Sequence, residues 1–298
     1  MKPKNLDILC IGEVLWDRLP DKSIPGGAPM NVALHLKKVG YRVMMSSSVG
    51  NDQHGRDLAV FMNNEGVDTS LVQTNFELPT SEVPVVLDEF NNPTFDILEP
   101  VAWDQMYLTD ELHEAAQKVG TVVYGTLASR NELTRKTIHA VLEHDNIKLI
   151  DINMRPPYVN QNVVEDLVRK ADIVKMNEDE LRTMADWHHK PFRDLQQLIQ
   201  WFGESYPVSK VCVTRGKDGA MVLEDGIIFE HPGFHVNTVD TVGSGDAFLA
   251  GFISRLFEGS SAKEAITYAC ALGAYVATKA GATPAYDSQE ILSIMNAS

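Results

Sequence analysis

The hydrophobic positions along the chain fall into two patterns. Short apolar runs between polar or glycine residues predict buried strands, at residues 6–11, 41–49, 121–124, 148–151, 172–175 and 211–214. Longer stretches in which apolar residues recur every three or four positions predict amphipathic helices, at residues 30–39, 55–64, 110–118, 132–144, 163–169, 194–202, 247–257 and 262–279. Because strands and helices alternate, we expect an α/β fold with a central, mostly parallel, doubly wound sheet flanked by helices.

Two stretches interrupt this alternation. Residues 81–103 alternate between apolar and polar around a turn at 91–93, which predicts a hairpin with one solvated face. Residues 14–24 run extended toward a Pro- and Gly-rich turn. We expect these two segments to form a small β-sheet lid across one end of the main domain. No linker or repeat divides residues 1–298, which predicts a single domain with the lid segments inserted.

Composition and charge limit the classes of function. The 298 residues are 44% hydrophobic, so the chain can bury a sizeable core and is not disordered. The 26 Lys and Arg residues against 41 Asp and Glu residues give a net charge of −15 without a basic cluster. We therefore expect neither nucleic acid nor a membrane as a partner. Cys10, Cys212 and Cys270 each lie in an apolar run, which predicts buried thiols in a reducing, cytoplasmic compartment.

One stretch near the end of the chain combines residues suited to phosphate chemistry. Residues 240–248 read DTVGSGDAF and lead into a predicted helix. The glycines leave backbone N–H groups free at the helix start, where partial positive charge attracts an anion. Asp246 can accept a proton from a hydroxyl that attacks this anion. The stretch therefore predicts phosphoryl transfer, with residues 243–246 around the anion and Asp246 as the base.

The same residues are compatible with other interpretations. Gly243 and Gly245 nearly match the dinucleotide fingerprint G-x-G-x-x-G. That fingerprint needs a first strand before it and a second strand after it, whereas here another helix follows. No G-x-x-x-x-G-K-[ST] occurs, which excludes a P-loop in its usual form. An acid such as Asp246 can also simply complement the helix dipole, so the motif by itself does not establish catalysis.

Two motifs together resemble a known family. Residues 26–33 (GGAPMNVA) and 240–248 (DTVGSGDAF) are similar to motifs of the ribokinase-like, or PfkB, carbohydrate kinases, and the chain most resembles the fructokinases among them. The order of the expected elements agrees over nearly the whole chain. The resemblance implies a ribokinase-like fold and transfer of the γ-phosphate of Mg-ATP to a sugar hydroxyl.

The resemblance assigns the sugar and phosphate-transfer roles. Asp246 matches the catalytic base, and Arg155 matches a residue that contacts the sugar or the phosphate in transfer. The backbone amides of the family's anion hole match Gly243, Ser244 and Gly245. The sugar contacts match Asp17, Gly26, Gly27, Asn31 and Asn153, and we expect the lid to supply an apolar wall from Phe95 and Trp103.

The nucleotide and metal roles follow in the same way. Asn177 and Glu180 match residues that organise the water shell of Mg²⁺, an ion that prefers oxygen ligands and often keeps its waters. Asp240 and Val242 match the loops that hold K⁺ in many relatives. The residues matched to the ATP site are Lys175, Asn177, Thr214, Gly216, Gly219, Gly243, Gly245, Ala271 and Ala274.

The resemblance implies a cytoplasmic fructokinase that phosphorylates the 6-hydroxyl of fructose with Mg-ATP. We expect the lid to close over the sugar and exclude water, and its exposed strand edges to pair between subunits in a homodimer. A 2-keto-3-deoxygluconate or ribose kinase would share the phosphate machinery and differ near residues 17–31 and in the lid. A regulator that binds sugar and nucleotide without catalysis is the alternative from a different class, and the intact Asp246 and Glu180 argue against it.

Overall fold

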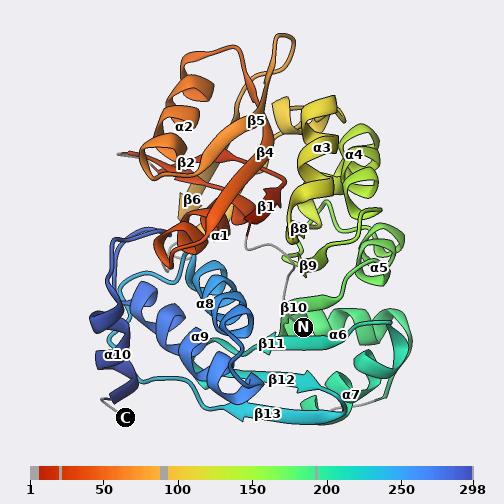
Figure 1. Ribbon diagram of the computed structural model, residues 1–298, viewed down its shortest axis with the longest axis vertical. Helices are drawn as coiled ribbons and strands as arrows, with labels where there is room; N and C mark the ends of the chain where they lie inside the picture. The colour runs from red at the N-terminus through yellow and green to blue at the C-terminus, as the bar shows by residue number, and fades with distance from the viewer. Residues whose placement is uncertain (1–6, 20–21, 88–92, 192–193, 297–298) are drawn as a thin grey trace.

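The computed structural model describes residues 7–19, 22–87, 93–191 and 194–296, and a large twisted sheet runs through it (Figure 1). This main sheet has the strand order β13-β12-β11-β10-β9-β8-β1-β4-β5. From β11 along this order to β5, each strand pairs with its neighbours in parallel. Strand β12 pairs antiparallel with β11, and β13 pairs antiparallel with β12. The bounds are β1 (Asp7–Ile11), β4 (Arg42–Gly50), β5 (Asp68–Asn75), β8 (Thr121–Gly125), β9 (Ile147–Asp151), β10 (Ile173–Asn177), β11 (Lys210–Thr214), β12 (Ala220–Glu224) and β13 (Ile227–His231).

Helices cover both faces of this sheet. One face carries α3 (Asp110–Lys118), α4 (Glu132–Leu142), α5 (Gln161–Arg169), α6 (Glu178–Trp187) and α7 (Leu195–Ser205). The other face carries α1 (Ala28–Lys38), α2 (Gln53–Asn64), α8 (Ser244–Glu258) and α9 (Ala262–Ala277), with α10 (Ser288–Asn296) packed on α9.

The central strand β1 shows how the sheet separates two hydrophobic cores. Leu9 and Ile11 pack into one core, and Ile8 and Cys10 pack into the other, because successive side chains of a strand point to opposite faces. A strand buried on both faces needs a continuous apolar run, which is the pattern that identified it in the sequence. The expected doubly wound α/β fold is confirmed.

A separate small sheet contains the expected lid segments. Its order is β3-β2-β6-β7, with β2 (Leu15–Arg18), β3 (Ser23–Gly26), β6 (Ser81–Leu87) and β7 (Pro93–Phe95). Strands β6 and β7 form the expected antiparallel hairpin, whereas β2 pairs with β6 in parallel. The side chain of Phe95 lies outside the described part of the structure, as do residues 91 and 92 of the turn.

The expectation that Trp103 forms a wall of the lid is wrong. Trp103 lies in a 3₁₀ helix, η1 (Ala102–Gln105), beyond the small sheet, and has no exposed surface. Its ring packs under the Arg130 guanidinium, 4.1 Å from ring centroid to Cζ, and Arg130 in turn pairs with the buried Asp104 at 2.8 Å. Trp103 is therefore part of the main core, and a charged group stacked on its ring allows both to be buried together.

Strand β5 and helix α10 are among the elements that the sequence pattern missed. Strand β5 contains only Leu71 and Val72 as apolar residues, because it is the edge strand of the main sheet and much of it is in contact with water. Helix α10 buries only Ile291 among its residues. In both elements too few apolar residues are buried for a regular spacing to show in the sequence.

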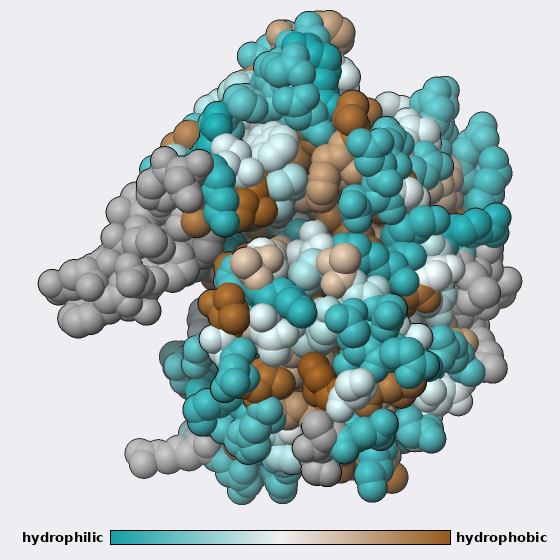
Figure 2. Space-filling model, turned by 90° about the vertical axis from the view of Figure 1, so that its left-hand side faces the viewer, coloured by the Kyte–Doolittle hydropathy of each residue, from teal (hydrophilic) through white to brown (hydrophobic). Residues whose placement is uncertain are grey.

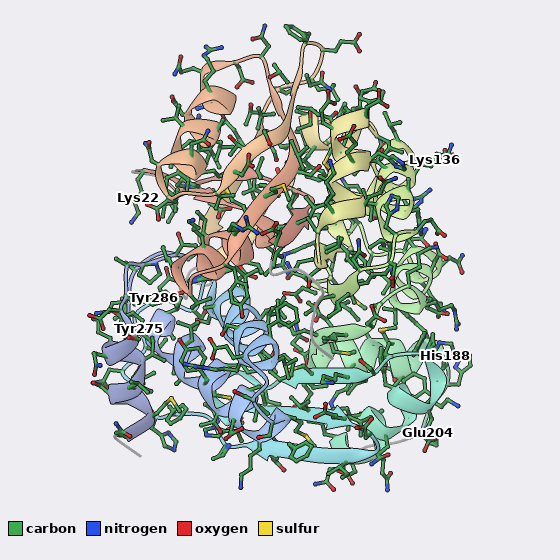
Figure 3. The ribbon with its side chains drawn as sticks, in the orientation of Figure 1. Lys22, Lys136, His188, Glu204, Tyr275 and Tyr286 are labelled. Atoms are coloured by element: carbon green, nitrogen blue, oxygen red, sulfur yellow. The ribbon has the colours of Figure 1, made fainter. Side chains whose placement is uncertain are left out.

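The face of the molecule that Figure 2 turns to the viewer is mainly hydrophilic. Figure 2 shows a face on which apolar residues form small, separate areas between polar ones. Charged side chains such as Lys136 of α4 and Glu204 of α7 lie along the outer side of the helices (Figure 3). Within the described ranges, no helix has the length and apolar character needed to cross a membrane.

The buried position of Trp103 can be tested by its effect on stability. Trp103→Ala should lower the free energy of unfolding by about 3 to 5 kcal/mol, the usual cost of removing a large buried aromatic side chain. Phe76→Ala is the matched control, because Phe76 is 81% exposed and its loss should change stability by less than about 0.5 kcal/mol. Urea unfolding of both variants would contradict this placement if they lost similar amounts.

Candidate active site

The polar residues of the candidate site gather at one edge of the main sheet. Asp151, Asn177 and Thr214 are the last residues of β9, β10 and β11, and Glu13 follows the end of β1. The carboxyl ends of parallel strands meet at the same edge, and ligands of open α/β sheets bind there. The first turns of α1 and α8 complete the arrangement on one face.

The start of α8 carries the backbone N–H groups of Gly243 and Gly245, whereas the N–H of Ser244 donates to the carbonyl of Thr241 over 3.2 Å. Gly243 is the residue before the helix and adopts a φ of +76°, in the left-handed region that favours glycine. A Cβ atom on Gly243 would collide with the backbone of Ala282, so no other residue fits there. Ser244 and Gly245 begin the first turn, where N–H groups have no partner within the helix. The three residues predicted to form an anion site therefore lie together at one helix start.

Asp246 lies in the first turn of α8 and is held by α1. The side-chain amide of Asn31 donates to Oδ2 of Asp246 over 2.8 Å. Burial and the nearby Asp151 raise the pKa of Asp246 to about 6, although Lys175 and the Asn31 hydrogen bond act in the opposite direction. Near neutral pH the carboxylate is thus mostly ionised. Its raised pKa also makes it a stronger proton acceptor than an ordinary carboxylate.

A buried ion pair lies behind the α8 turn. The Lys175 ammonium lies 2.9 and 2.8 Å from the two carboxylate oxygens of Asp151, and both side chains are buried. Burial would lower the pKa of Lys175, but Asp151 and Glu180 more than offset it and raise the pKa. A Cβ atom on Gly245 would lie 3.2 Å from Nζ of Lys175, so this glycine lets the ammonium approach the turn. The pair places a fixed positive charge at the anion site.

The predicted sugar-binding residues lie on the small sheet and the start of α1. Asp17 is in β2, and burial raises its pKa to about 6 while the Arg155 charge lowers it. Gly26 of β3 lies against the Asp17 carboxylate, where a side chain would clash with Oδ2. Gly27 precedes α1 with a φ of +112°, and a Cβ there would meet the carbonyl of Glu13.

Two further predicted residues lie in the loop after β9. Asn153 adopts a φ of +44°, which is uncommon for a residue other than glycine. Arg155 is exposed and donates to the carbonyl of Met154 over 3.1 Å, so its guanidinium is otherwise available. The charge of Arg155 acts on Asp17, Glu13 and Asp246, which places it among the acids of the site.

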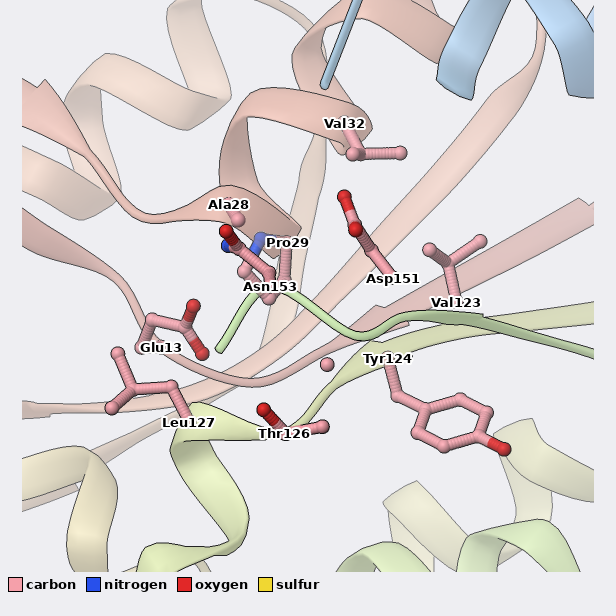
Figure 4. A pocket seen from close by; sticks show the side chains of 11 residues that line it. Glu13, Ala28, Pro29, Val32, Val123, Tyr124, Thr126, Leu127, Asp151 and Asn153 are labelled. Atoms are coloured by element: carbon pink, nitrogen blue, oxygen red, sulfur yellow. The ribbon is translucent and has the colours of Figure 1, made fainter. Parts of the chain in front are cut away.

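Glu13 is an acid of the site that the sequence analysis missed. Its side chain is 2% exposed and its Oε2 atom has no hydrogen-bond partner among the described residues. Burial raises the pKa of Glu13 to about 7, with further contributions from Asp246 and Asp151. Figure 4 shows Glu13, Asn153 and Asp151 around a cavity of about 10 Å³ between the start of α1 and the ends of β8 and β9. A lone acid after a buried strand belongs to no motif, so no sequence pattern indicates its role.

Glu180 connects two loops of the site. Its Oε2 atom accepts from the backbone N–H of Asn177 over 2.8 Å, and its Oε1 atom accepts from that of Met154 over 2.7 Å. Asn177 returns the contact by capping α6 through the N–H of Glu180. Glu180 thus fixes the loop that leads to Arg155. Both carboxylate oxygens of Glu180 are thus engaged with the backbone, and its contact with Mg²⁺ through water stays a prediction.

A cleft of about 550 Å³ adjoins the α8 turn on the side of β11 and α9. Its walls include the predicted residues Asn177, Thr214, Gly216, Gly219, Ser244, Gly245 and Ala274. The loop after β13, residues 233–238, forms a wall that the sequence analysis missed, because this loop has no periodic pattern. The cleft has the size of a small-molecule site and opens directly onto the N–H groups of α8.

The placement of Ala271 in this cleft is wrong. Ala271 has no exposed surface and belongs to the buried cluster that includes Tyr275 of α9 and Ile291 of α10. Its neighbours Cys270, Gly273 and Ala274 line the cleft instead. The small residues Ala271, Gly273 and Ala274 indicated the right helix, but their size alone did not show which of them face the cleft.

Asp240 ties together the loops that the resemblance assigned to K⁺. Its two carboxylate oxygens accept from the N–H groups of Val242 and Gly281, each over 3.0 Å. Among the described residues, no group of three or more His, Cys, Asp or Glu side chains is placed to hold a metal. Asp240 therefore has a structural role in this loop, and the K⁺ site stays a prediction.

Comparisons with known proteins point to one family. A family profile described as pfkB family carbohydrate kinase matches residues 20–289. A fructokinase of Salmonella typhimurium is 27% identical over 308 residues, covering 97% of this chain and 98% of the relative. A fructokinase of Vibrio cholerae with bound fructose, ADP and calcium superposes with a TM-score of 0.83 at 25% identity, over 97% and 98% of the two chains. A sugar kinase of Pyrococcus horikoshii in complex with ATP gives 0.81 at 25% identity, over 96% and 97%.

The burial of Glu13 predicts a pH-dependent effect on stability. Its raised pKa means that the folded state favours the neutral acid, so this stabilisation is present below pH 4.5 and is lost as the pH rises toward about 7. Glu13→Gln stays neutral, and its stability relative to the unchanged protein should rise by up to about 3 kcal/mol between pH 4.5 and 8.

Urea unfolding at pH 5 and pH 8 measures this difference. The exposed Glu204→Gln serves as the control for removing one acidic charge. A difference for Glu13→Gln that is the same at both pH values would contradict the burial of an ionisable Glu13.

Proposed function

The chain belongs to the pfkB family of carbohydrate kinases, and from this premise we propose that it transfers the γ-phosphate of ATP to the 6-hydroxyl of fructose. The observation that carries the proposal is the meeting of two sites at Asp246. The sugar-side motif reaches this carboxylate through Asn31, and the anion-binding turn of α8 is its direct neighbour in the chain.

In the proposed reaction Asp246 accepts the proton of the sugar hydroxyl. The hydroxyl oxygen then forms a bond to the γ-phosphorus, the bond from that phosphorus to the bridging oxygen breaks, and ADP leaves. Asn31 keeps the carboxylate aimed at the hydroxyl through its 2.8 Å hydrogen bond. A pKa of about 6 leaves Asp246 ionised at neutral pH yet basic enough to act.

The start of α8 stabilises the charge on the phosphate in transfer. The N–H groups of Gly243 and Gly245 and the helix dipole act on the oxygen atoms of that phosphate, and the Lys175 ammonium lies beside the same turn. Asp151 holds Lys175 in place. The exposed Arg155 is free to neutralise further charge from the sugar side.

The sugar and the nucleotide approach this turn from opposite sides. Asp17 and Asn153 bind sugar hydroxyls, because carboxylate and amide groups suit a vicinal diol. ATP occupies the cleft between the loop at Gly216 and α9, with the phosphates toward α8. Asn177 and Glu180 would hold Mg²⁺ through waters, and the ion would supply positive charge to the phosphates.

The remaining parts of the proposal concern the lid and the assembly. We place one kinase domain at residues 1–298, with the small sheet as a lid that closes on the sugar and excludes water. The edge strands β3 and β7 of the small sheet suit pairing in a homodimer. The three free, buried cysteines fit a cytoplasmic protein.

The sugar itself is the finer part of the proposal. A 2-keto-3-deoxygluconate or ribose kinase would need the same α8 turn, so the choice depends on Asp17, Asn153 and Arg155. The proposed sugar side of the site carries two acids, Asp17 and Glu13, and one exposed arginine, Arg155. This balance of charge favours an uncharged sugar over a sugar acid.

ADP release against a panel of sugars tests the proposal. With fructose, ribose, mannose, glucose and 2-keto-3-deoxygluconate, we expect the highest kcat/KM for fructose. Asp246→Asn should lose about 10² to 10⁴ of the turnover, the usual contribution of a general base, and still bind ATP in calorimetry. Turnover with another sugar alone would refute the choice of fructose. Near-normal turnover of Asp246→Asn would refute the role of the base.

A further inference from the structure

We propose that His35 of α1 is a positioning residue that holds the anion-binding turn of α8 in place through the backbone of Ala282. The inference rests on the proposed kinase function, because that function gives the α8 turn its task. His35 touches neither the cleft nor the residues matched to substrate, and it acts through a loop in the last part of the chain.

The two ring nitrogens of His35 have fixed roles. Nε2 lies 2.9 Å from the carbonyl oxygen of Ala282, and Nδ1 lies 2.9 Å from the hydroxyl of Tyr286. A carbonyl oxygen only accepts, so Nε2 carries the proton. Nδ1 is then the bare acceptor if the ring is neutral, and the Tyr286 hydroxyl donates to it.

The surroundings keep His35 neutral. The side chain has no exposed surface, and burial lowers its pKa to about 4. The ring also stacks on that of Tyr286, with centroids 5.7 Å apart and planes 18° apart. Tyr286 lies beside Tyr275 of α9 (Figure 3), at 5.8 Å between ring centroids, which fixes the tyrosine from its other side. The histidine is therefore a rigid link and not a titrating group near neutral pH.

Ala282 contacts both His35 and Gly243, and so connects the histidine to the α8 turn. The backbone of Ala282 packs so closely on Gly243 that a Cβ atom there would meet both its Cα and its carbonyl oxygen. The carbonyl that His35 holds is thus the same one that lies against Gly243. If that carbonyl is released, Gly243 loses the surface that fixes its left-handed conformation, and the N–H groups of the turn lose their direction.

One face of α1 carries the contacts that align the site. Asn31, His35 and Lys38 are spaced so that they lie on the same side of the helix. Asn31 holds Asp246, His35 holds Ala282, and Nζ of Lys38 donates to the carbonyl of Thr283 over 2.6 Å. The helix that carries the sugar-side motif therefore also sets the position of the phosphate-side turn.

Four variants test the inference in full-length protein with fructose and ATP. His35→Leu removes both hydrogen bonds, and His35→Gln keeps an N–H donor for Ala282 and an oxygen acceptor for Tyr286. Tyr286→Phe removes one buried phenol hydroxyl, and Tyr41→Phe is its control, because the Tyr41 hydroxyl donates to Ser254 of α8 away from the turn.

The expected result is a separation of kcat from KM. In His35→Leu kcat should fall by about 10- to 100-fold, the scale of a misplacement near 1 Å, while KM for sugar and ATP changes by less than about threefold. His35→Gln should restore kcat to within about threefold of the unchanged protein. Tyr286→Phe should lose part of kcat, and Tyr41→Phe should lose none.

The opposite results overturn the inference in distinguishable ways. If folded His35→Leu keeps its kcat, or if His35→Gln is no better than His35→Leu, His35 only supports the fold and the kinase function stands. If nitrogen-15 spectra show the proton on Nδ1 instead of Nε2, the assigned link to Ala282 is wrong. If the unchanged protein transfers no phosphate to any sugar, the proposed function fails and this inference fails with it.

Discussion

The hydrogen bond from Asn31 to Asp246 is the contact on which the site depends. It joins residues 215 positions apart over 2.8 Å and brings the start of α1 to the start of α8. A base that takes a proton from one substrate and stands beside the phosphate of another must lie where the two binding sites meet. The doubly wound sheet makes this possible, because α1 and α8 pack side by side on one face with their N-terminal ends at the same edge.

Charge at this point is balanced locally in a strongly acidic protein. The chain has a net charge of −15, yet its site must receive phosphates. Positive potential comes from the α8 start, from Lys175 and from Arg155, whereas Glu13, Asp17 and Asp246 lie close by on the sugar side. Burial raises the pKa values of all three acids, and repulsion from neighbouring carboxylates adds to the rise for Glu13 and Asp246. In the proposed function, the acidic half of the site binds sugar hydroxyls and the positive half binds phosphate.

Most of the fold, and the two motifs that form the ends of the site, could be predicted from the sequence. The reasons differ between elements. Strands such as β1 are buried on both faces and therefore form continuous apolar runs. The start of α8 is marked in the sequence by Gly243, where only glycine fits, and by Gly245, where a Cβ atom would lie 3.2 Å from Nζ of Lys175. The exposed strand β5 left no such pattern.

Other features depend on three-dimensional packing that no local pattern records. Trp103 was expected in the lid because it follows an alternating stretch. Its ring instead packs in the core, against the guanidinium of Arg130. Ala271 lies on the correct helix and the wrong face. Glu13 and His35 act through partners far along the chain, at Asp246 and at Ala282, so neither belongs to a motif.

The central claim is that Asp246 directs a sugar hydroxyl, the one on C6 of fructose, at the γ-phosphate of ATP. Two-dimensional ³¹P–¹H NMR of the reaction product tests it most directly. The account predicts a phosphorus signal that couples to the two protons on C6, together with one equivalent of ADP. Coupling to the protons on C1, or inorganic phosphate as the only new phosphorus signal, would contradict it.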